Sequence, residues 1–210
     1  DKDEIIILGS TCSVMTNAIK RLGAIPIYSD IDLDTLGSEY ESIKKLINIK
    51  TKIIIAQHSF GIPCNIEPIV KLAKLNKIFL LEDCALSFDS SICELKVGNF
   101  GDAAIFSTDH TKPINTIIGG MVYTRNNVFF TNLKLSKKHV KEISYKKQNA
   151  LWLQFLNERK KRNPDNTGKI FITSFIDNFQ KKYFGKVAPF LTDDYSLSFK
   201  SSYPYPSNMP

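Results

Sequence analysis

Short apolar runs alternate with longer amphipathic segments through residues 1–125, and this alternation constrains the fold more than any other feature of the sequence. Three runs are of strand length, rich in β-branched residues and almost unbroken: Glu4–Leu8, Lys52–Gln57 and Ile78–Leu81. Continuous apolar runs of this kind are typical of parallel strands buried on both faces. The segments between them have the length and patterning of helices: Ser13–Leu22, Ser38–Ile47 and Asn65–Leu75. This order of strands and helices predicts an α/β protein with right-handed crossovers.

The clearest of these helices is Asn65–Leu75. Its apolar residues recur every three to four positions and therefore form one face. Asn65 is expected to be the N-cap, and Glu67 lies in the first turn, where the helix dipole favours a negative charge. Two more strands are predicted farther along the chain, at Ala103–Ser107 and Gly120–Thr124.

The chain changes character after Arg125. Residues 1–125 contain 13 Lys and Arg against 15 Asp and Glu, whereas residues 126–210 contain 15 against 6, so the second part carries all of the net charge of +7. Two helices are predicted there, Asn126–Leu156 and Ile170–Phe184. Basic chains often bind nucleic acid, but only charge supports that function here. Because a lysine-rich helix is commonly just a solvated face, we expect no nucleic-acid binding.

Composition excludes further classes of protein. With 43% hydrophobic and 23% charged residues, the chain is not intrinsically disordered. No apolar run approaches the roughly 18 residues that span a bilayer, so we expect no membrane association. Its four cysteines contain no C-x-x-C pair and are accompanied by only three histidines, which disfavours a zinc site. Without a secretion signal, free thiols and a cytoplasmic location are expected.

The residues best suited to chemistry lie between Ile78 and Thr124. One apolar strand ends in Glu82 and Asp83, and ligands of open parallel sheets bind beyond the carboxyl ends of the strands. Ser107 ends the next predicted strand, and Lys112 follows in a polar loop. An amine for a Schiff base, an acid for the pyridine nitrogen and a hydroxyl for the phosphate are what a pyridoxal phosphate site needs. The alternative is that these acids and Lys112 are ordinary solvated charges.

Two histidines lie close to this stretch or to another strand end. His58 ends an apolar strand, so it either lines the pocket or makes a structural hydrogen bond. His110 lies two residues before Lys112, and it is either a proton-transfer group or an exposed loop residue.

Five blocks of sequence follow one another in a recognisable order. They are Asn17-Ala18-Ile19 with Gly23-Ala24-Ile25-Pro26, Thr51-Lys52-Ile53-Ile54 with His58 and Gly61, Glu82-Asp83-Cys84-Ala85, Gly98 and Gly101-Asp102 with Phe106-Ser107, and Thr111-Lys112 with Gly119-Gly120-Met121-Val122. In this order and at these separations, the blocks resemble the DegT/StrS family of pyridoxal-phosphate-dependent sugar aminotransferases. Several ordered blocks are far more specific than a single short motif.

The resemblance implies a role for five residues. Lys112 forms the Schiff base with pyridoxal 5′-phosphate and moves a proton, Asp83 binds the pyridine nitrogen, and Ser107 contacts the phosphate. Leu86 and Cys12 occupy two further cofactor-binding positions, where this chain departs from the family pattern. Members often have Gln or His at the position of Leu86, near the phenolic oxygen of the cofactor. Many members place an aromatic ring at the position of Cys12.

The resemblance also implies a fold class, which is the large domain of fold-type I pyridoxal-phosphate enzymes: a three-layer α/β/α sandwich with a mostly parallel sheet. Residues 1–125 are expected to form part of this cofactor-binding domain, and residues 126–210 its helical, lysine-rich remainder. The implied activity transfers an amino group from glutamate to a nucleotide-linked keto-sugar, for polysaccharide or lipopolysaccharide biosynthesis. A homodimer with the site at its interface is expected, and the chain is expected to be an internal piece that lacks an N-terminal Ser-Gly-Thr segment and a C-terminal domain.

Two other functions remain open at this point. A sugar dehydratase of the same family is one, although its members have a histidine in place of the Schiff-base lysine, so Lys112 argues against it. A non-catalytic or decayed cofactor-binding relative is the other, because Leu86 and Cys12 depart from the family pattern.

Overall fold

The computed structural model describes residues 2–109, 111–116 and 119–138, together with residues 142, 144–145, 148–149, 152–153 and 155–156. The chain divides into two compact units, Asp1–His139 and Val140–Pro210. The elements below belong to the first unit. None of the described helices is both long and apolar enough to cross a bilayer.

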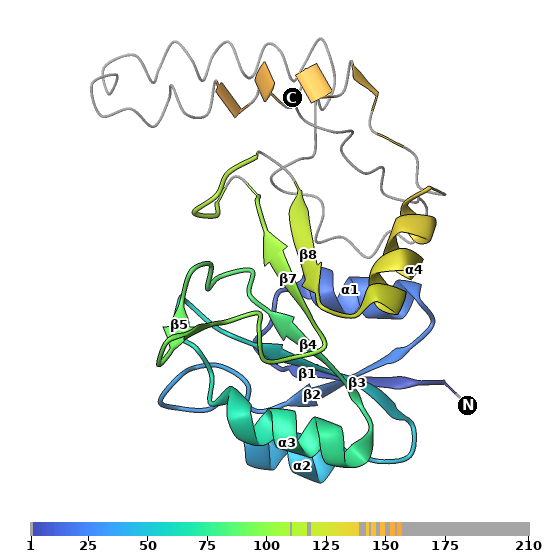
Figure 1. The fold of residues 1–210 in the computed structure, drawn as a ribbon, viewed down its shortest axis with the longest axis vertical. Helices are drawn as coiled ribbons and strands as arrows, with labels where there is room; N and C mark the ends of the chain where they lie inside the picture. Colours follow the sequence, from blue (N-terminus) through green and yellow to red (C-terminus); the bar gives the residue numbers. More distant parts are fainter. Residues whose placement is uncertain are drawn as a thin grey trace, which may run out of the picture. The chain divides into compact units, whose positions relative to one another are not determined.

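A six-stranded sheet forms the centre of this unit, in the order β2-β1-β3-β4-β7-β8 (Figure 1). Its strands are β1 (Glu4–Leu8), β2 (Ile25–Ser29), β3 (Thr51–Gln57), β4 (Phe79–Asp83), β7 (Ala103–Ser107) and β8 (Gly120–Thr124). All neighbouring strands are parallel except β8, which runs antiparallel to β7. A separate short hairpin of β5 (Ser91–Ile92) and β6 (Leu95–Lys96) lies in the connection from β4 to β7.

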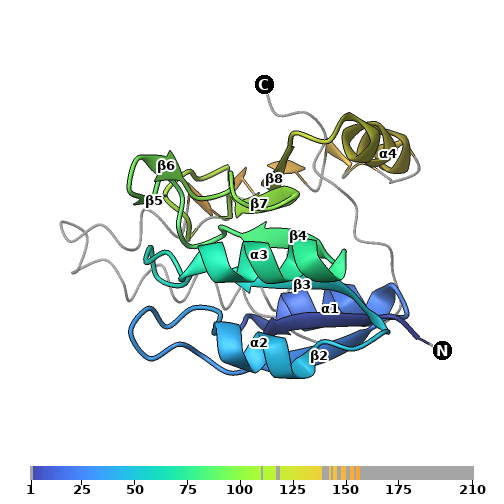
Figure 2. The same ribbon diagram turned by 60° about the horizontal axis from the view of Figure 1, so that its bottom comes forward.

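Helices cover both faces of the sheet (Figure 2). α2 (Tyr40–Leu46) and α3 (Ile66–Asn76) lie on one face and α1 (Ser13–Arg21) on the other, while α4 (Asn127–Lys137) follows β8. The chain moves from β1 outward to β2 and then returns past β1 to β3, so the direction of winding reverses between β1 and β3. Right-handed crossovers therefore place α1 opposite α2 and α3. The mostly parallel three-layer α/β/α fold expected from the sequence is confirmed.

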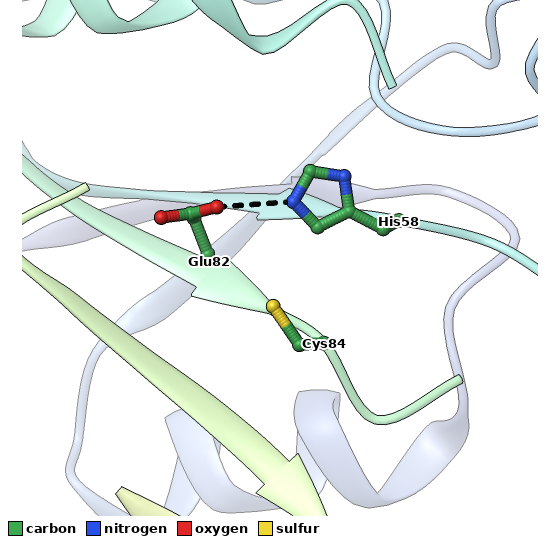
Figure 3. Close-up of side chains that lie close together, drawn as sticks. All are labelled: His58, Glu82 and Cys84. Atoms are coloured by element: carbon green, nitrogen blue, oxygen red, sulfur yellow. Dashed lines mark hydrogen bonds and ion pairs between the residues drawn. The ribbon is translucent and has the colours of Figure 1, made fainter. Parts of the chain in front are cut away.

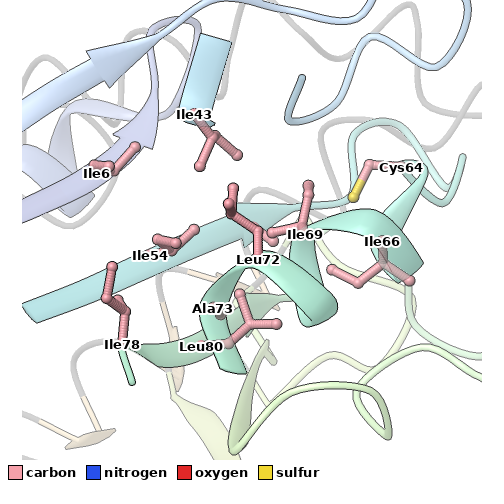
Figure 4. Close-up of a cluster of buried hydrophobic side chains, with 11 residues drawn as sticks. Ile6, Ile43, Ile54, Cys64, Ile66, Ile69, Leu72, Ala73, Ile78 and Leu80 are labelled. Carbon is pink, nitrogen blue, oxygen red and sulfur yellow. The ribbon is translucent and has the colours of Figure 1, made fainter. Parts of the chain in front are cut away.

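Two apolar clusters hold these layers together. Consecutive side chains of a strand point to opposite faces, so each buried strand contributes to both clusters. Toward α2 and α3 the strands contribute Ile6, Ile54, Ala56 and Leu80 (Figure 4). Toward α1 they contribute Ile5, Ile7 and Ile55, with Ile53 and Leu81 partly buried. This two-sided burial explains why these strands read as unbroken apolar runs.

One strand of the six-stranded sheet was not expected from the sequence, nor were the short strands β5 and β6. β2 contains Pro26 and has exposed side chains at Ile25 and Tyr28, so it lacks the continuous apolar run of the other strands. It lies at the edge of the sheet, where a proline is tolerated because one side of the strand needs no hydrogen bonds.

The helix expected over Asn126–Leu156 is shorter than predicted. α4 begins after Asn126, whose side chain accepts hydrogen bonds from the N–H groups of Val128 and Phe129, and it ends at Lys137. All four residues between Leu135 and Val140 are polar, so one helical turn there has no apolar side chain to bury. The expected helix Ile170–Phe184 lies outside the described residues. Asn65 is the N-cap of α3, as expected, although its side chain makes no capping hydrogen bond.

Candidate active site

The five residues expected to form the site all lie where the parallel strands end, an edge of the sheet that we call the carboxyl edge. Asp83 is the last residue of β4, and Ser107 is the last residue of β7. Cys12 is the N-cap of α1, in the connection that follows β1. Leu86 and Lys112 lie in the segments that follow β4 and β7. This is the edge at which open α/β sheets bind their ligands.

Asp83 is buried, so the alternative that it is an ordinary solvated strand-end acid is wrong. Its Oδ1 accepts a hydrogen bond of 3.0 Å from the N–H of Ala85. Among the residues that the structure describes, none donates a hydrogen bond to Asp83 Oδ2. Burial raises the pKa of Asp83, and the positive charge of Lys112 is among the effects that oppose this rise. Asp83 is therefore a buried carboxylate that a cation would stabilise.

Lys112 is partly buried, and its position is fixed through the backbone. Its N–H donates to the carbonyl of Asp109 at 2.9 Å. Within the described ranges, the Lys112 ammonium has no hydrogen-bond or ion-pair partner. The positive charge of Lys112 is nevertheless among the effects that lower the pKa of Asp83, so the two groups are close enough to interact.

The loop that carries Lys112 is closed by Thr108, a buried residue directly after β7. The N–H of Thr108 donates to the carbonyl of Gly119 at 3.0 Å, and its carbonyl accepts from the N–H of Thr116 at 2.8 Å. The hydroxyl groups of Thr108 and Thr116 lie 2.6 Å apart. Both ends of the Lys112 loop therefore meet at one residue, a contact that no local sequence pattern indicates.

The other three expected residues show no direct interaction with Asp83 or Lys112 in the described part of the chain. Ser107 is partly buried, and its Oγ accepts a hydrogen bond of 3.4 Å from the N–H of Asp109, which leaves its hydroxyl proton free to donate. Leu86 is 39% exposed and offers no polar atom. Cys12 is an exposed free thiol, and the expectation that all four cysteines are free is confirmed.

Glu82, the neighbour of Asp83, forms a second buried polar centre (Figure 3). Its Oε2 accepts from His58 Nε2 at 3.2 Å and from the N–H of Gly98 at 2.8 Å. Its Oε1 accepts from the N–H groups of Phe100 and Gly101, both at 2.7 Å. Burial by itself raises the pKa of Glu82, but these hydrogen bonds outweigh burial and lower the pKa below its ordinary value. Glu82 is therefore ionised and fully hydrogen-bonded, not solvated.

His58 is a structural histidine and not a pocket residue. It is fully buried, and its Nδ1 accepts a hydrogen bond of 3.1 Å from the N–H of Cys64, so its proton is on Nε2 and points to Glu82. Its own backbone N–H donates to the carbonyl of Asp83 at 3.1 Å. His58 and Glu82 thus connect the ends of β3 and β4 to the turn that precedes β7. His110, the other histidine considered, lies outside the described residues.

His58, Glu82 and Cys84 lie close enough together to suggest a metal site (Figure 3). Their hydrogen bonds argue against one. Both Glu82 oxygens and both His58 ring nitrogens already have protein partners. Burial and the nearby negative charge of Glu82 raise the pKa of the Cys84 thiol, so it stays protonated and is a poor metal ligand. The cluster is a structural hydrogen-bond network.

Comparisons with known proteins place the chain in a family. Residues 1–155 match the model of the DegT/DnrJ/EryC1/StrS aminotransferase family. The chain belongs to this family. Among its members, GDP-perosamine synthase of Escherichia coli O157:H7 is 41% identical over 128 residues, which are 61% of this chain and 35% of that protein. GDP-perosamine synthase of Vibrio cholerae is 34% identical over 60% of this chain and 34% of its own length. The chain therefore spans about a third of these relatives.

Solved structures with the same fold also match this chain. The aminotransferase from Psychrobacter cryohalolentis superimposes with a TM-score of 0.63 at 30% identity, over 68% of this chain and 36% of its own. The GDP-4-keto-6-deoxy-D-mannose-3-dehydratase of E. coli, which was solved with bound hydrated pyridoxal phosphate, gives a TM-score of 0.59 at 29% identity. The match covers 64% of this chain and 34% of the dehydratase chain. Relatives of this chain therefore include both aminotransferases and a dehydratase.

Proposed function

We propose that this chain is part of a pyridoxal-phosphate-dependent aminotransferase that transfers an amino group from glutamate to a nucleotide-linked keto-sugar. The observation that carries the proposal is the placement of Asp83 and Lys112 at the carboxyl edge of a DegT/DnrJ/EryC1/StrS fold, where neither Asp83 Oδ2 nor the Lys112 amine has a hydrogen-bond partner among the described residues. In the overall reaction, the amino acid loses its amino group and becomes a keto acid, and the keto-sugar becomes an amino sugar.

The residues of the site fit the cofactor. A buried carboxylate whose pKa is raised by burial is stabilised by a nearby cation, and a protonated pyridine nitrogen is such a cation. Ser107 has a hydroxyl proton to donate to a phosphate oxygen. When bound, pyridoxal phosphate supplies an aldehyde that condenses with amines and a ring that withdraws electrons.

Each of these residues has a distinct role in the proposed site. Lys112 Nζ is the nucleophile that holds the cofactor, and once it is released it accepts and returns a proton as a neutral amine. Asp83 orients the ring and keeps the ring nitrogen protonated. By the family resemblance, Leu86 would lie near the phenolic oxygen of the cofactor without a polar atom to bond to it, and Cys12 would lie against the ring with a smaller surface than an aromatic side chain.

The proposed substrate class is based on relatives that match this chain. Two GDP-perosamine synthases match this chain over about 60% of its length, and one matched structure is a GDP-4-keto-6-deoxy-D-mannose-3-dehydratase, so GDP-linked 4-keto-sugars are the first substrates to test. We further propose that the protein acts as a cytoplasmic homodimer. Gel filtration of the complete protein tests the dimer.

A spectroscopic experiment tests the proposed chemistry. The complete protein with added pyridoxal phosphate is expected to show a visible absorption band that is absent from Lys112→Ala. Lys74→Ala is the matched control, because Lys74 is an exposed lysine in the last turn of α3 and is expected to keep the band. A wild-type protein without the band, or a Lys112→Ala variant that retains it, contradicts the proposal.

The dehydratase is the second candidate, since one matched structure is a sugar 3-dehydratase. Product analysis separates the two functions. An aminotransferase incorporates nitrogen from ¹⁵N-labelled glutamate into the sugar, whereas a dehydratase removes a hydroxyl group and leaves no label in the product. Turnover by either route also excludes a decayed, non-catalytic relative.

A further inference from the structure

A polar side chain at the end of β3 lies on the same face as Asp83. Gln57 is the register partner of Asp83 in the parallel pair of β3 and β4. Two residues earlier on the same strands, Ile55 and Leu81 both pack in the cluster beneath α1. Because side chains alternate along a strand, Gln57 and Asp83 both point to the α1 side of the sheet at its carboxyl edge.

Hydrogen bonds hold both the backbone and the side chain of Gln57. Its backbone N–H donates to Ser38 Oγ at 2.9 Å, and its carbonyl accepts from the N–H of Ser38 at 3.2 Å. Its side-chain amide donates to Ser59 Oγ at 3.1 Å. Its amide oxygen accepts a hydrogen bond of 2.6 Å from Thr11 Oγ1, and the side chain is only 9% exposed. Gln57 is thus a rigid polar group in a nearly closed environment.

The hydrogen bond to Thr11 crosses the point where the sheet changes its direction of winding. Thr11 lies between β1 and α1, directly before Cys12, whereas Gln57 ends β3. β1 and β3 are the neighbouring strands between which the winding reverses, and ligands of doubly wound sheets bind in the crevice at such a point. Gln57 therefore connects the loop that carries Cys12 to the strand beside Asp83.

We propose that Gln57 is a positioning residue for the cofactor ring. Its amide holds the Thr11–Cys12 loop at a fixed distance from Asp83, so that a ring bound to Asp83 meets the loop at the start of α1. A neutral amide has a second advantage at this position, because it fixes the loop without adding another negative charge beside a carboxylate whose ionised form burial already disfavours. This inference rests on the proposed function, since it takes pyridoxal phosphate as the ligand.

Equilibrium binding of pyridoxal phosphate to the complete apoprotein tests the inference without an activity assay. Gln57→Leu removes the amide at similar volume, and Thr11→Val removes only the hydroxyl that bonds to it. Each variant is expected to raise the dissociation constant by about tenfold, the effect of one lost hydrogen bond. Because both variants break the same bond, the double variant is expected to bind no more weakly than the weaker single variant. Additive effects, or unchanged binding in either single variant, overturn the inference.

Gln57→Glu separates positioning from a purely structural role. A carboxylate can still accept from Thr11 and from the rotating hydroxyl of Ser59, so the loop stays in place, but a negative charge is added beside Asp83. The pKa of Asp83 then rises further, and the acid limb of the pH profile for cofactor binding shifts to higher pH. If the profile does not move, Gln57 does not face the cofactor site and the inference fails.

The wild-type protein distinguishes this inference from the proposed function. If the wild type binds pyridoxal phosphate and shows the band that depends on Lys112, the proposed function stands whatever the Gln57 variants do. If the wild type does not bind it, both proposals fail together. Should Gln57→Leu not fold by circular dichroism, Thr11→Val and Gln57→Glu still decide the outcome, because Thr11→Val removes a single hydroxyl and Gln57→Glu keeps an acceptor for both Thr11 and Ser59.

Discussion

Replacing Glu82 by glutamine keeps the shape of the side chain and removes its charge. Glu82 accepts four N–H hydrogen bonds, two at each oxygen. A glutamine has one oxygen and one NH2 group, so it can satisfy only one of these pairs. If the oxygen stays with Phe100 and Gly101, the NH2 group faces the N–H of Gly98 and the Nε2–H of His58. His58 cannot resolve the clash by moving its proton, because its Nδ1 already accepts from Cys64.

The size of the effect follows from this count. Two donors lose their acceptor, and a hydrogen bond to a charged group contributes about 1.5–3 kcal/mol, so the loss is about 3–6 kcal/mol. Removal of a buried charge relieves part of its desolvation cost, which places the expected loss near the lower end, at about 3 kcal/mol. With a urea m-value of about 2 kcal/mol/M, the unfolding midpoint falls by about 1.5 M.

Urea unfolding of the complete apoprotein, followed by circular dichroism, measures this loss. Glu94→Gln is the matched control, since Glu94 is exposed and makes no hydrogen bond or ion pair in the described part of the chain, and it is expected to change stability by less than about 0.5 kcal/mol. The difference between wild type and Glu82→Gln is also pH-dependent. The pKa of Glu82 is lowered in the folded state, so its stabilisation is complete above the unfolded pKa of about 4.3 and is lost as the pH falls through the lower, folded value. A Glu82→Gln midpoint equal to that of Glu94→Gln at pH 7 would refute the four-donor argument.

Two further substitutions test the site and the turn beside it. Asp83→Asn is expected to raise the melting temperature of the apoprotein at pH 7, because burial raises the pKa of Asp83 and wild-type stability falls as the pH rises through that raised value. Equal melting temperatures contradict this. The same variant is expected to abolish cofactor binding, which a titration with pyridoxal phosphate measures. Gly98→Ala is expected to cost at least about 2 kcal/mol more than Gly23→Ala in urea unfolding. Both glycines have positive φ, +90° and +78°, but a Cβ at Gly98 lies 2.7 Å from the Phe106 ring whereas the space at Gly23 is open, so equal losses exclude crowding as the cause.

The strands that the sequence predicted are those buried on both faces. Ile5, Ile6 and Ile7 pack alternately beneath α1 and beneath α2 and α3, so each of these three positions is apolar and the strand could be recognised from the sequence. β2 packs at the edge of the sheet, where Pro26 and an exposed Tyr28 are tolerated, and the same criterion could not find it. The pattern of apolar residues indicates which positions are buried, so it does not predict a strand such as β2, which is held mainly by backbone hydrogen bonds.

The sequence predicted those residues of the candidate site that end or follow a strand. It did not predict contacts between residues that are far apart in the sequence. Asp83 and Ser107 end their strands, so their place at the carboxyl edge could be read directly. The bond between Thr11 and Gln57 joins residues 46 positions apart, and it depends on β1 and β3 being neighbours, which only the topology establishes. The two glycines of the Gly98–Gly101 turn could be identified in the sequence, but only the structure shows that their N–H groups donate hydrogen bonds to Glu82 of β4.

The two consecutive acids at the end of β4 have different roles, because Glu82 is structural and Asp83 is the candidate cofactor-binding residue. Glu82 points into the same layer as Leu80, where four N–H groups hold it ionised and lower its pKa, so it is saturated and can bind nothing more. Asp83 points to the opposite layer, where burial raises its pKa by more than the hydrogen bond from Ala85 and the charges of His58 and Lys112 lower it. Because consecutive side chains of β4 point to opposite faces of the sheet, one acid fixes the end of the strand and the other remains able to bind a cation. Since a saturated carboxylate has no free lone pair for a ligand, the acid at position 83, and not the one at position 82, is the one that can bind a cation.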